Sequence, residues 1–314
     1  MIRPLHPIDV PSYLSFAKNA CCGEGVEGWE EGQAPMRFLD FLGRSLAWDA
    51  PRQTWVYTQG RQILGLVAVK SRPGAAVWEI DRLIGVDSPQ ADRALASLLE
   101  HLACLGGEEG VQKIFLRLPS ASSLLPLARR AGFFVYASER LYRASVRPTR
   151  VQVEAPPLRG RRGYDHPALF DLYTRSVPLR ARQAEALTLQ EWRWLDGWQP
   201  RRHWRFNLAR SRRDYVWVDQ GLVVAAVRLE RRRHLIGVAI DQAKIGPREA
   251  DGVLSFALSH MPESAPLLCP VREYQETLEG AVRRFGFEQV GEYALLVKQL
   301  AVRVGDRCLV PVGV

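Results

Sequence analysis

The feature that most constrains this chain of 314 residues is an internal repeat, because one order of predicted elements occurs twice. The first copy has a strand at 1–5, helices at 9–20 and 35–48, a hairpin at 54–70, a strand at 76–86, a helix at 90–105, a strand at 111–118, a helix at 122–131 and final strands at 133–146. The second has helices at 167–175 and 188–197, a hairpin at 214–230, a strand at 234–240, a helix at 247–261, a strand at 265–269, a helix at 273–285 and final strands at 287–304.

Local sequence matches support a duplication. The stretch ARRAGFFVYASERLYR at 128–143 aligns with VRRFGFEQVGEYALLV at 282–297, and ADRAL at 91–95 aligns with ADGVL at 250–254. His101 then falls on His260, and the Trp-Val and Gln-Gly pairs of the first hairpin fall on those of the second. We therefore predict two domains, 1–147 and 148–314, and expect both histidines to pack against the core or the sheet.

The composition excludes several classes of protein. Hydrophobic residues make up 47% of the chain, which is enough for two buried cores. The five cysteines are scattered without a C-x-x-C pair, so we expect a reducing, cytoplasmic setting and no metal site. The N-terminal sequence lacks the apolar core of a signal peptide, and no apolar stretch approaches the roughly 20 residues that span a bilayer. We expect no membrane partner.

Basic charge is concentrated in one segment. Residues 158–213 hold thirteen arginines and five acids, a net +8 out of the chain's +9. Four tryptophans, at 192, 194, 198 and 204, lie among these arginines. Basic and aromatic residues together bind polyanions or stack on bases, which allows nucleic acid or an acidic partner. The alternative is a solvated helical face whose tryptophans anchor it to the sheet or to the first domain.

The order of elements resembles that of the GNAT N-acetyltransferase superfamily. RRAGFF at 129–134 and RRFGFE at 283–288 look like the helix-end signature of that superfamily, and each precedes predicted strands, of which the superfamily has two. The resemblance covers both halves. It implies an α/β (α+β) protein of two tandem GNAT-like domains, each with a mixed, mostly antiparallel central sheet flanked by helices.

The resemblance also implies a function and a site. Acetyl-coenzyme A, or another acyl-coenzyme A, would lie where the central parallel strands separate, and an acyl group would pass directly to a small-molecule or peptide amine. Alternation places Glu79 and Asp81 on one strand face, where either is a candidate base; a partly exposed face paired with arginine is the alternative. The implied roles are catalysis for Glu79, Asp81 and Tyr142, cofactor binding for Ile84, Val86, Gln90, Arg93 and Ala94, and a substrate wall for Arg180, Arg182, Trp192 and Trp194.

Both copies depart from the family's phosphate loop, which is rich in glycine. The first copy reads QADRAL at 90–95, and the second reads READGV at 248–253 with one glycine. We expect Asp92 in the first copy, and Glu249 and Asp251 in the second, to satisfy the free N–H groups of their own helices and to repel a pyrophosphate. The position where the family often has tyrosine holds Ala128 and Val282.

These departures leave a second hypothesis open. The chain would be a catalytically inactive binding protein that holds no cofactor and uses the basic, aromatic segment for an acidic ligand or nucleic acid. Asp241 is expected to be the second-copy counterpart of Asp81. The apolar stretch 308–314 would allow a homodimer by adding a strand to a neighbouring chain.

Overall fold

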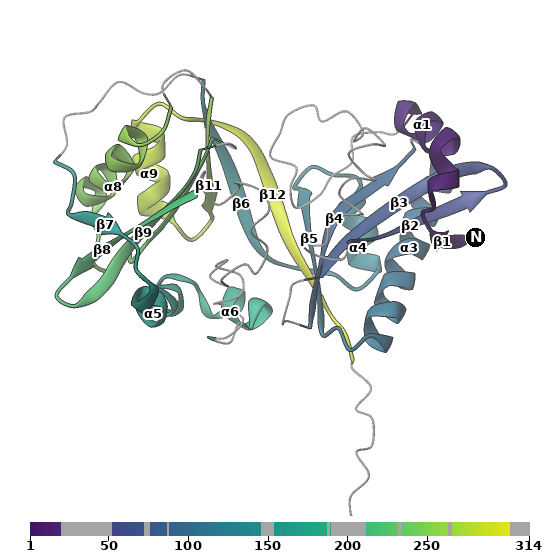
Figure 1. Cartoon of the computed structure of the whole chain (residues 1–314), viewed down its shortest axis with the longest axis horizontal. Helices are drawn as coiled ribbons and strands as arrows, with labels where there is room; N and C mark the ends of the chain where they lie inside the picture. The colour runs from purple at the N-terminus through teal and green to yellow at the C-terminus, as the bar shows by residue number, and fades with distance from the viewer. Residues whose placement is uncertain are drawn as a thin grey trace, which may run out of the picture. The chain divides into compact units, whose positions relative to one another are not determined.

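The computed structural model describes residues 1–19, 52–71, 76–86, 88–145, 154–186, 189, 212–231, 234–262 and 266–301. Contacts between residues divide the chain into two compact units. Unit 1 comprises Met1–Val135 and Leu295–Val314, and unit 2 comprises Tyr136–Ala294. Each unit contains a mixed sheet with helices against it (Figure 1).

The sheet of unit 1 has the strand order β1-β2-β3-β4-β5-β12. Neighbours from β1 to β4 are antiparallel, whereas β4 and β5 are parallel. Residues 63–69 of β3 are all buried, as expected for a strand covered on both faces. The strands are β1 (Ile2–Pro4), β2 (Arg52–Gln59), β3 (Gln62–Ser71), β4 (Val77–Gly85), β5 (Lys113–Pro119) and residues 295–299 of β12 (Glu288–Gln299).

Two helices cover opposite faces of this sheet. A short 3₁₀ turn (Pro7–Asp9) leads into α1 (Val10–Asn19), whose Tyr13 and Phe16 pack against apolar side chains of β2, β3 and β4. On the other face, α3 (Pro89–Glu108) buries an apolar stripe. Helix α4 (Leu124–Arg130) follows β5 and ends before Gly132, whose φ of +85° provides the left-handed C-terminal position.

Unit 2 repeats this plan with the strand order β12-β6-β11-β10-β9-β8-β7. Its parallel pair is β10 with β11, the counterpart of β4 with β5. The strands are β6 (Phe134–Ala144), β7 (Leu158–Gly160), β8 (Arg212–Asp219), β9 (Leu222–Glu230), β10 (Leu235–Ile240), β11 (Leu267–Arg272) and residues 288–294 of β12.

The helices of unit 2 also lie on both faces of its sheet. A 3₁₀ turn (Gly163–Asp165) leads into α5 (His166–Ser176), which packs on β8 and β9 through Leu169 and Leu172. Helices α8 (Pro247–Ser259) and α9 (Glu276–Arg284) pack into the core of the opposite face. Helix α6 (Leu179–Glu185) and strand β7 were not expected from the sequence.

The last strand of each sequence copy contributes to the other unit. Residues 136–144 of β6 come from the first copy but belong to unit 2, where they pair with β11 from Glu139 to Ala144. Residues 295–299 of β12 come from the second copy but belong to unit 1. The boundary predicted at 147/148 therefore lies between the two sequence copies but does not coincide with the division into units. A domain limit at this position stays a prediction.

An ion pair between a partly exposed arginine and a buried aspartate marks the start of each copy and supports the duplication. Asp9 Oδ1 lies 2.6 Å from Arg3 Nη2, and Asp165 Oδ1 lies 2.7 Å from Arg159 Nη2. In each copy the backbone N–H three residues before the aspartate also donates to Oδ2. The hydrogen bond from its arginine holds the pKa of each aspartate below the ordinary value.

The hairpins show that the sequence alignment was wrong by one or two residues. The first turn is Gly60-Arg61, with φ of +60° at Gly60, whereas the second is Gln220-Gly221, with positive φ at both residues. The strand registers make Tyr215, not Trp217, the counterpart of Trp55. The histidines pack as expected: His101 meets Trp55 with ring centroids 4.6 Å apart, and His260 meets Tyr215 at 5.2 Å.

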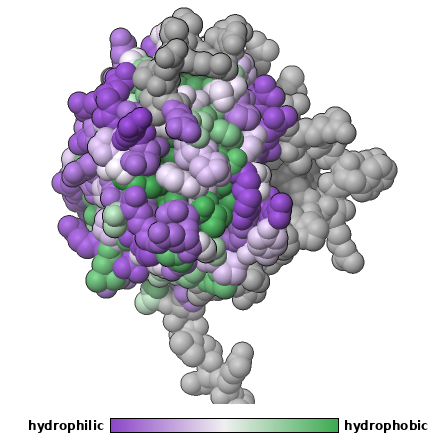
Figure 2. All heavy atoms as spheres, turned by 90° about the vertical axis from the view of Figure 1, so that its left-hand side faces the viewer, coloured by the Kyte–Doolittle hydropathy of each residue, from purple (hydrophilic) through white to green (hydrophobic). Residues whose placement is uncertain are grey.

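Other expectations have mixed outcomes. Each Gly-Phe pair is followed by one long strand, β6 or β12, instead of two. The helix predicted at 35–48 lies outside the described residues, as does nearly all of the one at 188–197. No helix among the described residues has the length and apolar character to cross a bilayer. On the face of unit 2 in Figure 2, hydrophobic patches lie among mostly hydrophilic side chains.

Candidate functional site

Strands β4 and β5 of unit 1 separate part of the way along. Their parallel register joins Val77–Glu79 to Lys113–Phe115 and ends there, although β4 continues to Gly85 and β5 to Pro119. The second half of β4 therefore has no paired strand on its β5 side among the described residues, and this separation of the two strands is called the opening. Polar backbone groups at such an edge need partners, and a ligand can supply them.

The register with β3 shows which backbone groups face this opening. The Val86 N–H donates to the Leu64 carbonyl at 3.2 Å, and the Val86 carbonyl accepts from the Ser88 N–H at 2.9 Å. Because hydrogen-bonded pairs alternate along an antiparallel ladder, Ile84 also bonds to β3. The groups of Leu83 and Gly85 then point toward β5. Sequence reasoning placed this role one residue away, at Ile84 and Val86.

A β-bulge separates the two candidate bases. Ala68 pairs with Arg82 and Val69 with Ile80, so Asp81 is the additional residue of the bulge. The bulge breaks simple alternation, and the register places Glu79 on the same sheet face as Arg82. Glu79 is half-buried and Asp81 is buried. Asp81 has no partner in the β3 register, and a shared face for Glu79 and Asp81 stays a prediction.

Ser88 occupies the start of α3. Its Oγ accepts from the Ala91 N–H at 3.2 Å, and Pro89 has no N–H to offer. Sequence reasoning assigned this capping to Asp92, which is exposed in the first turn beside exposed Arg93. Gln90 is exposed and Ala94 is buried on the same helix. A serine directly before proline was the signal that could have identified the cap.

Unit 1 does have glycines near this corner, but they serve packing. A Cβ on Gly85 would lie 2.9 Å from Leu95 Cδ1, and one on Gly65 would lie 3.1 Å from Leu95 Cδ2. These contacts bring α3 close to β3 and β4. These two glycines lie in β3 and β4, not in the predicted phosphate loop at 90–95.

In unit 2, side chains of the chain itself bridge the corresponding opening. Strands β10 and β11 pair only at Leu235 and Leu268. Gln275 Nε2 donates to the Val238 carbonyl at 3.0 Å, and Gln275 Oε1 accepts from the Arg272 N–H at 2.9 Å. By register Val238 is the counterpart of Leu83.

Gln242 makes a second bridge near the end of β10. Its Oε1 accepts from the Thr277 N–H at 3.0 Å, and its amide nitrogen donates to the Tyr274 carbonyl. Neither Gln242 nor Gln275 was identified from the sequence. Their backbone partners depend on the tertiary fold, and no local pattern indicates them.

The carboxylates at α8 behave differently from the expectation. Asp251 binds the Arg284 guanidinium of α9, with Oδ1 2.7 Å from Nη2, instead of capping its own helix. The N-cap is Gly246, which makes no side-chain capping bond, and a Cβ there would lie 2.9 Å from Glu249 Oε2. The one glycine in the predicted loop, Gly252, lies against the backbone oxygen of Glu154, where a Cβ would approach to 2.8 Å.

Asp241 is not the counterpart of Asp81. Its N–H donates to the Val224 carbonyl, as that of Val86 does to Leu64, so Asp241 and Val86 are equivalent. Asp241 is buried, pairs with Arg175 of α5, and its Oδ1 accepts from the Ala243 N–H at 3.2 Å. The carboxylate therefore fixes the turn after β10.

Tyr142 belongs to unit 2, whereas Glu79 and Asp81 belong to unit 1. Its hydroxyl donates to Glu279 Oε1 at 2.7 Å and accepts from Arg283 Nε at 3.2 Å. Arg140 Nη1 binds the other oxygen of Glu279 at 2.7 Å. Burial raises the pKa of the Tyr142 hydroxyl, and its bond to Glu279 raises it further.

The predicted substrate wall is only partly described. Arg180 is exposed on α6, and Arg182 Nε donates to the Val177 carbonyl at 3.0 Å. Trp192 and Trp194 lie outside the described residues. Within the described part of the chain, no group of three or more His, Cys, Asp or Glu side chains is arranged to hold a metal ion.

Comparison with known proteins supports the fold assignment. No protein-family model and no curated protein matches the chain. Among solved structures, a tandem GNAT protein from the clavulanic acid biosynthesis pathway is similar over 95% of this chain and 98% of its own, with 16% identity and a TM-score of 0.52. A GCN5-related N-acetyltransferase from Sphaerobacter thermophilus is similar over 95% of both chains, with 14% identity and a TM-score of 0.58. The chain has the tandem fold of the GNAT superfamily, built from two GNAT-like halves.

Proposed function

We propose that the protein is an acyl-coenzyme A-dependent N-acyltransferase, with its cofactor cleft in unit 1. The observation that carries the proposal is the difference between the two openings. The opening of unit 2 is bridged by Gln275, whereas in unit 1 the turn between β5 and α4 carries the small residues Ser120, Ala121 and Ser122. Unit 1 therefore leaves the backbone of Leu83 and Gly85 for a pantetheine arm and the thioester.

The proposed chemistry is direct transfer. A bound acyl-coenzyme A would supply the acyl group as a thioester, and an acceptor amine would displace its thiol, with a C–N bond formed as the C–S bond breaks. A backbone N–H on β4 would bind the thioester oxygen, and Glu79, on the face covered by α1, would accept the proton of the amine. The acceptor class is a small-molecule or peptide amine, and the cofactor is acetyl-coenzyme A or a close acyl analogue.

The phosphate groups of the cofactor would make few interactions with the start of α3. Ser88 and Pro89 leave few free N–H donors at the helix start, so we assign the main attraction to the exposed Arg93. This arrangement predicts a modest affinity. It also explains how the helix start can lack glycine and still belong to a cofactor cleft.

Calorimetric titration with acetyl-coenzyme A tests the proposal on the full chain. Ala121→Gln copies the bridging side chain of unit 2 into unit 1, and Arg93→Glu reverses the phosphate contact. Each should weaken binding by about tenfold or more, the loss of one good hydrogen bond or ion pair. The controls are Ser123→Gln, at an exposed helix start that makes no capping bond, and Arg61→Glu, at the exposed hairpin turn.

Two results would overturn the proposal. One is no binding at millimolar cofactor, and the other is binding that all four variants leave unchanged. A variant that weakens binding must also keep the unfolding temperature of the parent chain. Binding without release of coenzyme A thiol in the presence of a panel of amines would remove the enzymatic part and leave a cofactor-binding protein.

A further inference from the structure

Unit 2 contains a cavity of about 280 Å³ on the α5 side of its sheet. Its apolar wall includes Leu169 and Leu172 of α5 and Ala226 and Ala239 of the sheet. Arg161, Asp214 and Arg228 contribute a charged part of the lining, and Tyr173 and Tyr274 also line the cavity. All of these residues belong to unit 2.

Comparison of the two copies shows how this cavity arises. The strand registers and the shared ion pair make Tyr13, Phe16, Leu66 and Ile84 of unit 1 equivalent to Leu169, Leu172, Ala226 and Ala239. In unit 1 these four larger side chains form a packed cluster. In unit 2 all four positions carry a smaller residue, so the same layer encloses space.

The same comparison shows that three neutral residues of unit 1 correspond to charged residues of unit 2. Leu5 N–H donates to the Thr54 carbonyl, and Arg161 N–H donates to the Asp214 carbonyl, each at 2.9 Å. Leu5 and Thr54 are thus equivalent to Arg161 and Asp214. Ala68 is equivalent to Arg228, because each is the register partner of the residue at the Thr54 or Asp214 position. Three neutral positions in one copy are charged in the other.

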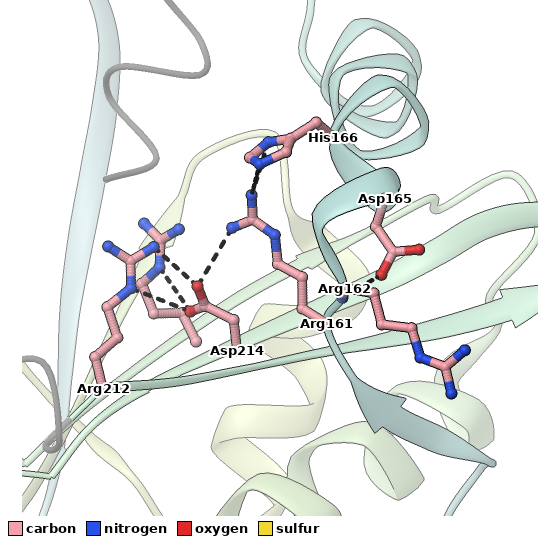
Figure 3. A network of polar contacts seen from close by, with 7 residues as sticks. Arg161, Arg162, Asp165, His166, Arg212 and Asp214 are labelled. Atoms are coloured by element: carbon pink, nitrogen blue, oxygen red, sulfur yellow. Dashed lines mark hydrogen bonds and ion pairs between the residues drawn. The ribbon is translucent and has the colours of Figure 1, made fainter. Parts of the chain in front are cut away.

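These charged side chains form the network in Figure 3. Asp214 Oδ2 lies 3.3 Å from Arg161 Nη1 and 2.9 Å from Arg212 Nη2, and Asp214 Oδ1 lies 3.1 Å from Arg228 Nε. Arg161 Nη2 also lies 2.8 Å from His166 Nδ1. Arg161 is well buried, with a side chain that is 8% exposed, so its charge is held at the pocket wall.

Three guanidinium groups lie around the Asp214 carboxylate, and guanidinium does not lose its proton in proteins. Burial would raise the pKa of Asp214, but the hydrogen bond from Arg212 and the charge of Arg228 hold it below its ordinary value. The carboxylate is therefore ionised and already has three cationic partners. Burial raises the pKa of Tyr173 and of Tyr274, so both phenols of the lining stay neutral.

We propose that unit 2 binds a small organic carboxylate in this cavity, with the charged end toward Arg161 and Arg228 and an apolar body along α5. Planar guanidinium groups match the geometry of a carboxylate, and the apolar wall favours a hydrocarbon body over a bare ion. A cationic ligand is disfavoured because Asp214 is already surrounded by arginines. Gln275 and Val238 also line this cavity, and because Gln275 already binds the Val238 carbonyl, we assign the site to binding without acyl transfer of its own.

The test uses benzoate, its neutral analogue benzamide, its cationic analogue benzylamine, and acetate, which lacks the apolar body. Titration of the full chain should give benzoate a Kd in the millimolar range or lower, as expected for a ligand of this size. Benzamide, benzylamine and acetate should each bind at least fivefold more weakly. Equal binding of benzoate and benzamide, or no benzoate binding up to about 10 mM, would overturn the proposal.

Two variants locate the site. Arg228→Gln removes one charge from the pocket wall and should weaken benzoate binding about tenfold, whereas Arg213→Gln, on the adjacent exposed position of β8, should leave it unchanged. Ala226→Leu restores the side chain that unit 1 carries at Leu66 and should reduce binding by filling the cavity. If both pocket variants fold and bind benzoate like the parent chain, the site is elsewhere and the proposal fails. Titration with acetyl-coenzyme A should be unaffected by Arg228→Gln, which separates this proposal from the proposed enzymatic function.

Discussion

The amide nitrogen of Gln275 lies 3.0 Å from the carbonyl oxygen of Val238, across the point where β10 and β11 diverge. The amide oxygen of the same side chain accepts the Arg272 N–H. One side chain therefore satisfies two backbone groups that a strand would otherwise bond. In unit 2 the separation of the parallel strands is thus spanned by a residue of the chain itself.

Replacing Gln275 by alanine should destabilise the protein. Gln275→Ala leaves the Val238 carbonyl and the Arg272 N–H without that side chain, which we expect to cost about 1–3 kcal/mol of unfolding free energy. Urea unfolding measures the change. Gln183→Ala, on the exposed face of α6, is the control and should have little effect. An equal effect of both variants would contradict the bridging role.

Replacing Asp165 by asparagine should cost stability at neutral pH and progressively less in acid. The Arg159 hydrogen bond lowers the pKa of Asp165 in the folded state, so the ionised carboxylate stabilises the fold above its unfolded pKa. This contribution is lost as the pH falls through the folded pKa. We expect Asp165→Asn to cost about 1–3 kcal/mol at pH 7 in urea unfolding, and the gap to the parent chain to narrow below pH 4.

The control for this measurement is Asp171→Asn. Asp171 forms an exposed pair with Arg175 in α5, and such pairs contribute little. A gap for Asp165→Asn that stays constant from pH 7 to strongly acidic conditions would show that the charge is not the cause.

Gly252→Ala should be more harmful than a typical glycine substitution within a helix. The new Cβ would lie 2.8 Å from the Glu154 carbonyl oxygen and 2.9 Å from Pro156 Cδ. The backbone of α8 or of the segment at Glu154 must therefore move. We expect a loss of roughly 1–3 kcal/mol in thermal or urea unfolding. Gly280→Ala is the matched control in α9, because its nearest neighbour at 3.1 Å is the tip of the Arg284 side chain. That variant should be neutral or stabilising by up to about 1 kcal/mol, and the reverse order would contradict the packing argument.

Tyr142→Phe separates a structural role from a catalytic one. The hydroxyl is buried between Glu279 and Arg283, so its loss should cost about 1–2 kcal/mol of unfolding free energy. We expect the rate of coenzyme A release in an acetyl-transfer assay to change by less than a factor of about two. A tenfold lower rate with unchanged stability would instead make Tyr142 the acid that protonates the thiolate.

Most of the fold could be predicted from the sequence, because the periodicity of hydrophobic residues and the turn residues are local signals. The strands from β2 to β6 and the helix α3 begin and end within a few residues of the predicted limits. Strand β7 was not predicted because Leu158–Gly160 is an edge strand of three residues, too short to show an alternation of apolar and polar residues. Its Arg159 was counted as part of a basic surface, whereas it binds Asp165.

The site could be predicted only coarsely, because the pairing register of β3 with β4 decides which groups face the site. A bulge at Asp81 changes which residues share a face with Glu79, and a shift of one residue exchanges the backbone groups of Ile84 and Leu83. Bulges and strand pairing depend on contacts distant in sequence. Likewise, the partners of Arg161 and Arg175 are Asp214 and Asp241, which lie far away in sequence, so part of the arginine-rich segment is used inside the protein.

The exchange of last strands has a consequence for synthesis on the ribosome. Unit 1 needs residues 295–299 to complete its sheet, so it remains one strand short while all of unit 2 is being made. During that interval the edge of β5 is exposed to other nascent chains, and a fragment ending near residue 147 would keep that edge permanently. The two halves repeat one order of elements, yet neither can be separated from the chain with its sheet intact.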